Sequence, residues 1–167
     1  MKIKILQTEE VPKAVQLARG VFEYCLRNTI NEAQLIESFY TYVREENIRQ
    51  LMEEQKLTLW AAYDEQNNMV AVSGMQSEGH ITLLYVLPYF QRRGYGKKLL
   101  LTMREYARGT LELAQVTVNA MPAWTASYFA KNKFKAGQNP QPVPYAFMHA
   151  KSVESTEYPK KEIPTAA

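Results

Sequence analysis

The residues of this chain best suited to chemistry form a short basic loop that contains two glycines. An apolar run at 81–87 is followed by Pro88 and then by the segment 91–98, which reads Gln-Arg-Arg-Gly-Tyr-Gly-Lys-Lys. Because Gly94 and Gly96 lack a Cβ, the main chain there can adopt positive φ and approach a ligand closely. The unpaired N–H groups and the dipole of a helix that begins here attract anions, and the basic side chains strengthen that field. The pattern therefore predicts a phosphate-binding site.

Two better-known glycine loops do not match this spacing. A P-loop requires G-x-x-x-x-G-K-[ST], which occurs nowhere in the chain. The dinucleotide fingerprint requires a third glycine at position 99, where the chain has Leu99. The spacing that remains is Gln91-x-x-Gly94-x-Gly96.

This spacing resembles that of the GNAT superfamily of N-acetyltransferases, whose acetyl-CoA loop reads [RQ]-x-x-G-x-[GA] between a strand and a helix. The context supports the resemblance, since an apolar strand precedes the loop and an amphipathic helix follows it. The likeness covers nearly the whole chain to about Lys151. It is closest from Gly79 to Phe134, where the sequence is similar to a bacterial small-molecule branch. The resemblance implies transfer of an acetyl group from acetyl-CoA directly to a primary amine of a small molecule or peptide.

The resemblance also implies how acetyl-CoA would bind as co-substrate. In this fold the strand before the loop and the strand after its helix diverge, and the pantetheine arm fills the opening like an added strand. The N–H of Val86 would then face the thioester oxygen, and the loop would hold the pyrophosphate. The cofactor-binding residues that follow from the resemblance are Leu84, Tyr85, Val86, Gln91, Arg92, Arg93, Gly94, Tyr95, Gly96 and Lys97.

A general acid for the departing thiolate is implied by the family's tyrosine on the helix after the second diverging strand. Counting from Pro122 places Tyr128 at this position. Counting back from Phe134 in the pattern Y-x-x-x-G-F instead places Phe129 there, with Lys133 where the glycine would be. We predict Tyr128 as the acid, since a phenol with a pKa of about 10 can protonate a thiolate whose conjugate acid has a pKa of about 8.5.

His80, at the start of the strand before the loop, is the predicted general base. Several family members have a glutamate at this place that acts through a water molecule. An imidazole with a pKa of about 6.5 suits the same work at neutral pH. A structural histidine at the strand end is the alternative, and Glu78 is a substitute candidate for the base. The predicted catalytic residues are therefore Tyr128 and His80, and no metal is expected.

Composition and length indicate a globular chain. Of the 167 residues, 46% are hydrophobic and 22% are charged, and we expect one domain at 1–151 with a mobile C-terminal tail at 152–167. The chain has no apolar run of about 18 residues that could span a membrane, and its N-terminus has too short an apolar core for a secretory signal. The single cysteine, Cys25, allows no intramolecular disulfide. These features predict a cytoplasmic protein.

Hydrophobic periodicity predicts the elements that position the loop. A strand at 2–6 precedes a helix that is capped by Thr8 and runs to about Cys25, a second helical region follows Asn28, and a break near 45–47 precedes a short helix to Met52. The remaining predicted strands lie at 57–63, 69–76, 80–87, 114–119, 134–136 and 145–151, and the remaining helices at 94–108 and 122–132.

The resulting order is β-α-α-β-β-β-α-β-α-β-β. It is the order of the GNAT fold, so we expect an α/β (α+β) architecture with a mixed central sheet of about seven strands and helices on both faces. Pro122 is expected at the first position of its helix, and Gly109 just after the end of the preceding helix.

Two other functions compete with the enzymatic one. A non-catalytic GNAT-fold module that binds acyl-CoA is suggested by Phe129 and Lys133, which depart from the family pattern. A nucleic-acid-binding protein would use the segment 91–98, but a net charge of +3 and one short basic cluster favour it little. The expected partners are acetyl-CoA and an amine, with no nucleic acid and no membrane. A homodimer is possible, as in many family members, and the acceptor amine is left open.

Overall fold

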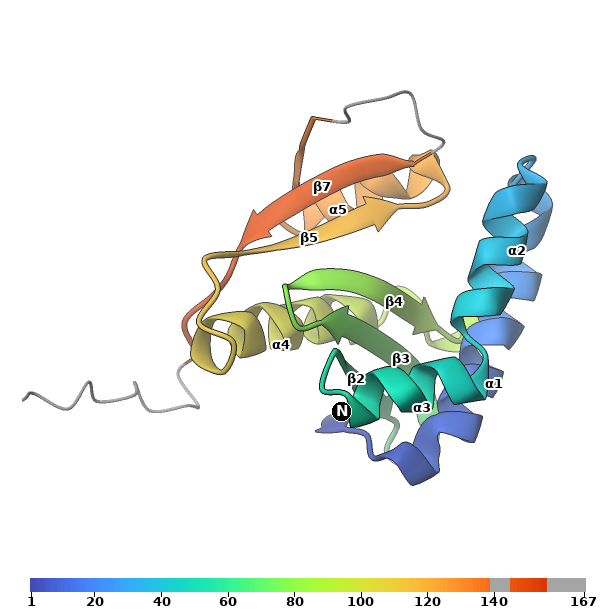
Figure 1. Cartoon of the computed structure of the whole chain (residues 1–167), viewed down its shortest axis with the longest axis horizontal. Coiled ribbons are helices and arrows are strands. Elements are labelled where there is room, and N and C mark those ends of the chain that lie inside the picture. Colours follow the sequence, from blue (N-terminus) through green and yellow to red (C-terminus); the bar gives the residue numbers. More distant parts are fainter. Residues whose placement is uncertain (139–144, 156–167) are drawn as a thin grey trace, which may run out of the picture.

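Seven strands of the computed structural model, which describes residues 1–138 and 145–155, form one mixed sheet in the order β1-β2-β3-β4-β5-β7-β6 (Figure 1). The strands are β1 (Lys2–Ile5), β2 (Leu57–Tyr63), β3 (Met69–Gln76), β4 (His80–Val86), β5 (Gln115–Ala120), β6 (Lys135–Ala136) and β7 (Ala146–Lys151). The longer helices are α1 (Val11–Val21), α2 (Ala33–Tyr42), α3 (Glu45–Glu53), α4 (Tyr95–Gly109) and α5 (Ala126–Lys131). The predicted fold class, a mixed sheet with helices on both faces, is confirmed.

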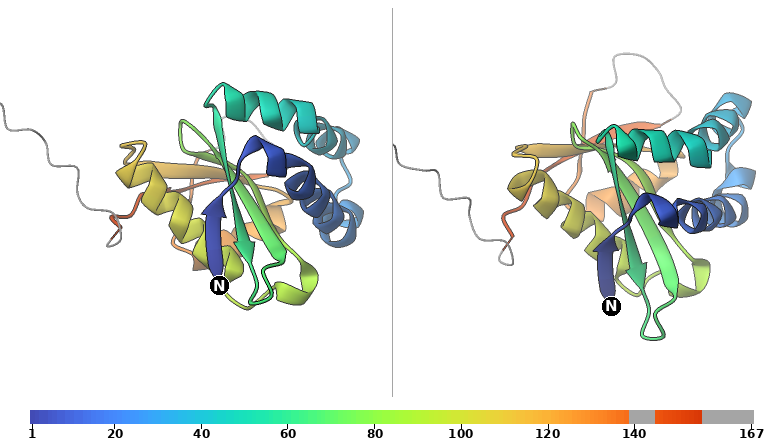
Figure 2. Two further views of the ribbon diagram at one scale, coloured as in Figure 1. Left: turned by 90° about the horizontal axis from the view of Figure 1, so that it is seen from below. Right: turned by 60° about the horizontal axis from the view of Figure 1, so that its bottom comes forward.

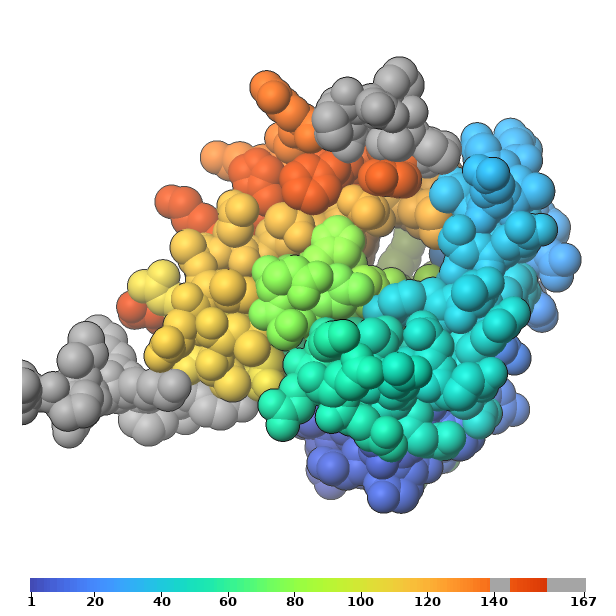
Figure 3. Space-filling view, in the orientation of Figure 1, coloured from blue at the N-terminus to red at the C-terminus, as the bar shows by residue number. Residues whose placement is uncertain are grey.

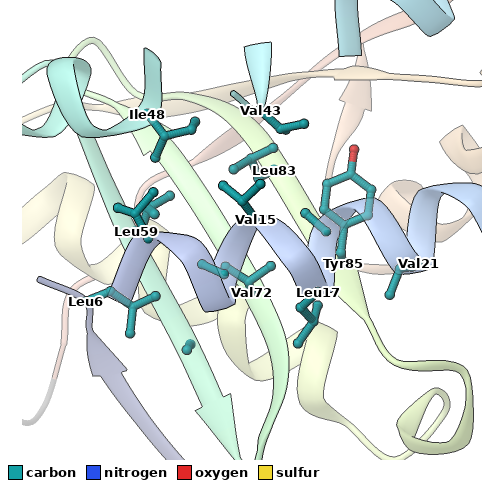
Figure 4. Close-up of a cluster of buried hydrophobic side chains, with 14 of the residues drawn as sticks. Leu6, Val15, Leu17, Val21, Val43, Ile48, Leu59, Val72, Leu83 and Tyr85 are labelled. Carbon is teal, nitrogen blue, oxygen red and sulfur yellow. The ribbon is translucent and has the colours of Figure 1, made fainter. Parts of the chain in front are cut away.

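The sheet separates two hydrophobic cores. Helices α1 and α3 pack on one face, whereas α4 packs on the other, as the two views in Figure 2 show. In the first core, the side chains of Val15, Leu59 and Leu83 meet between α1 and the strands (Figure 4). In the second core, Leu99 and Met103 of α4 are fully buried against the opposite face. Each such side chain contributes roughly 1.5–3 kcal/mol through burial, so both sets of helices are fixed to the sheet.

Strands β4 and β5 diverge soon after they meet. They are parallel and pair at only two positions, where His80 lies beside Thr117 and Ile81 beside Val118. The divergence begins at Thr82, which is an extra residue in β4, because Gly74 of β3 pairs with Leu83 and the next β3 residue pairs with Ile81. Such a bulge bends its strand. The result is a wedge between β4 and β5, as the resemblance implied, and it is visible in Figure 1.

Several predicted boundaries were wrong by one or two residues. The break between α2 and α3 falls at Val43 and Arg44, before the predicted 45–47. The N-terminal cap is Gln7 on a short 3-10 turn, not Thr8. Gly109 is the last residue of α4, with Thr110 as its cap. In each case neighbouring residues have similar propensities, so tertiary contacts choose between them.

The helix predicted at 122–132 is shorter than expected. Pro122 is the N-cap of a 3-10 turn, η5 (Ala123–Thr125), rather than the first residue of the helix, and the peptide bond before Pro122 is cis. The α-helical part, α5, begins at Ala126.

The start of the predicted C-terminal tail is held in place. Ser152 N–H donates to the carbonyl of Ala114 at 3.0 Å, and Val153 N–H donates to the carbonyl of Arg104 at 3.2 Å. Residues 152–155 therefore lie against α4 and the segment before β5, in contrast to the expected mobility. Residues 139–144, which lie between two predicted strands, and the tail residues 156–167 lie outside the described residues.

Candidate active site

A cavity of about 640 Å³ occupies the wedge between β4 and β5. Its walls come from β4, the glycine loop, the start of α4, the end of β5 and α5, and from the helical segment after α1. Most of the lining is apolar. The predicted site residues that line it are Leu84, Tyr85, Val86, Gln91, Arg92, Gly94, Gly96, Lys97 and Tyr128.

The first turn of α4 closes one end of this cavity. Gly94 is the N-cap residue and has φ of +89°, a conformation that other residues adopt only with strain. The first turn of the 15-residue helix carries no acidic residue, and Arg92 and Lys97 both line the cavity. The N–H groups of this turn have no intrahelical acceptor. The arrangement can hold an anion through main-chain donors, the helix dipole and two cations.

The edge of β4 that faces the wedge offers main-chain groups to a ligand. Leu87 N–H donates to the carbonyl of Val70 in β3 at 2.9 Å. Because successive residues of a strand direct their N–H and C=O groups to opposite edges, those of Val86 and Leu84 face the wedge. The side chain of Gln91 confirms this direction, since its Nε2 donates to the carbonyl of Val86 at 2.9 Å. The N–H of Val86 is therefore directed at the place predicted for a thioester.

Tyr128 of α5 reaches across the cavity to the first turn of α4. A Cβ added to Gly96 would collide with the Tyr128 hydroxyl and would lie 3.7 Å from Cγ2 of Val86. Glycine at position 96 thus leaves room for the phenol as well as for a ligand. Burial raises the pKa of Tyr128 to about 12, so the hydroxyl keeps its proton at neutral pH. This placement suits a proton donor.

Phe129, the alternative at the family position, has a different environment. It is buried in the second core, and its ring centroid lies 5.4 Å from that of Phe134. The α5 helix ends in a Schellman motif, in which Phe134 N–H donates to the Phe129 carbonyl at 3.1 Å and Lys133 N–H to the Ala130 carbonyl at 3.3 Å. Lys133 has φ of +74°, the conformation that favours glycine. The position therefore keeps the shape that the family's glycine would give.

The family follows from these features together with the comparison against family models. The model of the acetyltransferase (GNAT) domain matches residues 26–142, which include β4, the glycine loop, β5 and α5. The chain belongs to the GNAT superfamily of acetyltransferases. Membership implies acyltransferase activity, and it confirms the resemblance found in the sequence.

Solved structures of the superfamily share the fold of this GNAT domain. The PaiA N-acetyltransferase from Thermoplasma acidophilum, in complex with coenzyme A, is 17% identical, with a TM-score of 0.72 over 90% of this chain and 99% of that one. A GCN5-related N-acetyltransferase from Rhodopseudomonas palustris is 19% identical, with a TM-score of 0.73 over 90% and 94% of the two chains. A SpeG spermidine N-acetyltransferase chimera from Vibrio cholerae and hSSAT is 14% identical, with a TM-score of 0.63 over 90% and 95%. A comparison with curated proteins found no match.

Three predicted residues lie outside the cavity lining of the GNAT domain. The guanidinium of Arg93 lies over the ring of Tyr89, 4.3 Å from its centroid. Tyr95 packs on the second core. His80 is half-buried where the two strands still pair, and its Nδ1 is 2.8 Å from Oγ1 of Thr117. Burial lowers the pKa of His80, although the charge of Glu78 opposes the shift, so the ring is neutral at pH 7.

Sequence reasoning missed the residues that line the other side of the cavity. Cys25 and Leu26 lie on a π-helical turn, η2 (Phe22–Leu26), and Asn119 and Met121 lie at the end of β5 and just after it. The π-turn displaces the helix locally, which no hydrophobic period reveals. Among the described residues, no group of three or more His, Cys, Asp or Glu side chains could hold a metal ion, and no helix is long and apolar enough to cross a membrane.

Proposed function

We propose that this GNAT domain transfers the acetyl group of acetyl-CoA directly to a primary amine of a small molecule or peptide. The observation that carries the proposal is the wedge itself. It joins a helix end that can hold an anion, the main-chain groups of Leu84 and Val86 on the β4 edge and a protonated tyrosine within one cavity. A pyrophosphate, an amide-rich arm and a thioester require these three kinds of partner.

Each residue would then have a defined part in acyl transfer. Acetyl-CoA supplies a thioester that an amine can attack. The first turn of α4, with Arg92 and Lys97, would bind the pyrophosphate, and Leu84 and Val86 would pair with the pantetheine arm. The N–H of Val86 would stabilise the oxyanion by about 3 kcal/mol as the new N–C bond forms. Tyr128 would give its proton to the sulfur as the C–S bond breaks.

His80 would take the proton that the attacking amine loses. In the tautomer whose Nδ1–H donates to Oγ1 of Thr117, Nε2 is the nitrogen that would accept the proton through a water molecule. The lowered pKa keeps the ring neutral and therefore basic at pH 7. This role acts through water, because His80 itself does not line the cavity.

Calorimetry with CoA tests the core of the proposal. We expect binding in the micromolar range, together with release of free thiol when acetyl-CoA and an amine panel are added. Binding without thiol release across a broad amine panel would instead favour the non-catalytic acyl-CoA-binding module. Failure to bind CoA at about millimolar concentration would contradict both functions.

A further inference from the structure

The cavity has a second mouth on the side of the sheet opposite α4. Figure 3 shows an opening between α2, in light blue, and the segment that follows β5, in orange. Trp124 lines the cavity while 59% of its surface stays exposed. Its Nε1 lies 3.4 Å from Oγ1 of Thr29, so the indole bridges from η5 to the helical segment before α2. Trp124 therefore lines a part of the cavity that is open to solvent.

The described part of this cavity contains no carboxylate. Among its described lining residues, the charged ones are Arg92, Lys97 and Lys131, and all three are basic. Outside the lining, the carboxylate of Glu23 is already engaged, since it accepts the Tyr40 hydroxyl at 2.7 Å and lies 3.9 Å from Arg27.

This composition sets a limit on the number of amino groups that an acceptor can carry. An ammonium group that enters apolar surroundings without a carboxylate loses several kcal/mol of hydration, or it loses its proton because burial lowers its pKa. For the reacting nitrogen the loss of the proton is useful, since only the neutral amine is a nucleophile. A second ammonium group would lose the same hydration free energy without taking part in the reaction. The cofactor phosphates would offset Arg92 and Lys97 at the α4 end, and the described lining residues offer no anion near Trp124.

The same mouth offers apolar surface to the rest of the acceptor. Leu26 and Met121 line the cavity along with Trp124, and they come from opposite sides of the opening. An aromatic or branched aliphatic group placed among them would bury apolar area worth roughly 25 cal/mol per Å². We infer that the acceptor is a molecule with a single amino group on an apolar body, and that polyamines are poor acceptors. The inference rests on the proposed function, because it concerns the second substrate of the same cavity.

Calorimetry on the CoA-saturated full chain tests this acceptor class directly. Phenylethylamine should bind, and spermidine and putrescine should bind at least about 100-fold more weakly. With acetyl-CoA in place of CoA, thiol release should show the same ranking in kcat/KM. Equal or tighter binding of spermidine would overturn the inference, and so would failure of both kinds of amine to bind. Phenylethylamine that binds without being acetylated would refute the proposed enzyme activity while supporting the acceptor class.

Exchange of Trp124 provides a second test. Trp124→Glu adds a carboxylate at an exposed position, so we expect kcat/KM for spermidine to rise about 10-fold and that for phenylethylamine to fall about 10-fold, with unchanged CoA affinity. Trp124→Gln should lower phenylethylamine use with no gain for spermidine. Tyr24→Glu is the matched control, because Tyr24 is 80% exposed and outside the cavity lining. Identical behaviour of Trp124→Glu and Tyr24→Glu would overturn the inference.

Discussion

Two neighbouring strands each pass into a helix at the cavity, and the two junctions contribute different chemical groups. From β4 the chain enters α4 through Gly94, and the junction presents main-chain N–H groups. From β5 the chain enters α5 through η5, and the junction presents the side chain of Tyr128. Main-chain N–H groups are positioned by the residues that set the local backbone conformation, such as Gly94. The position of the Tyr128 side chain depends instead on the rotation of α5 about its axis, which the packing of Phe129 in the second core determines.

The largest effect is expected from a change at the junction of β5 and α5 that leaves the junction of β4 and α4 intact. Tyr128→Phe should lower kcat by about 100-fold or more, because it removes the proton donor, while the dissociation constant for CoA stays within about twofold. Steady-state kinetics and calorimetry measure the two quantities. Tyr24→Phe, on an exposed tyrosine outside the cavity, should change neither. Unaltered turnover in the Tyr128 variant would remove this residue from the mechanism.

Charge reversal probes the first junction. Lys97→Glu should weaken CoA binding by roughly 10- to 30-fold, since it replaces a cation with an anion beside the pyrophosphate. The variant should keep its thermal stability, because an acid in the first turn of α4 interacts favourably with the helix dipole.

Arg93→Glu is the matched comparison for that variant. Its guanidinium lies over Tyr89 and outside the cavity lining, so CoA binding should weaken by only about threefold. A larger effect at Arg93 than at Lys97 would show that the pyrophosphate lies on the outer side of the loop, as the sequence alone would allow.

His80→Gln tests the point where the two strands still pair. We expect kcat to fall by about 10-fold if water-mediated base catalysis operates. Burial lowers the pKa of His80 in the folded protein, so the unfolded chain binds this proton more readily. The free energy of unfolding therefore falls as the pH drops below the unfolded pKa of about 6.5. The free energy of unfolding should therefore depend less on pH below that value in the variant. If turnover is normal while the pH dependence of the free energy of unfolding is altered, the role of His80 is structural and not catalytic.

The smallest expected effect concerns the end of α5. Lys133 has φ of +74°, which is strained for a residue with a Cβ. Lys133→Gly should raise the free energy of unfolding by about 0.5–1 kcal/mol, after allowance for the greater freedom of glycine in the unfolded chain. Lys133→Ala keeps the Cβ and should give no such gain. Denaturant unfolding of the two variants measures the difference, and equal stability would contradict the argument.

Prediction from the sequence succeeded where local geometry is encoded by a few residue types. Gly94 adopts the expected positive φ, and the strand, loop and helix around it form as predicted. It succeeded less at helix ends, where Pro122 initiates a 3-10 turn instead of the helix itself. The cavity lining from η2 was not predicted, because hydrophobic periodicity does not reveal a π-turn.

The choice between Tyr128 and Phe129 shows the same limit. Both residues fit the family position by one way of counting, since the chain has one residue more than the pattern between the tyrosine and Phe134. Both side chains line the cavity, but Phe129 is buried in the second core, whereas Tyr128 is more exposed and brings a hydroxyl to the first turn of α4. This difference favours Tyr128 as the proposed acid.

The sequence by itself determined the sheet with helices on both faces and the strand, glycine loop and helix around Gly94, because periodicity and glycine act over a few residues. Only the tertiary structure decided which side chains share the wedge, since β4, β5, η2 and α5 are distant in sequence and meet through packing. The proposed acceptor end of the cavity, around Trp124, was also decided by the tertiary structure. Its described lining is apolar and contains no acidic residue because several segments that are distant in sequence come together there.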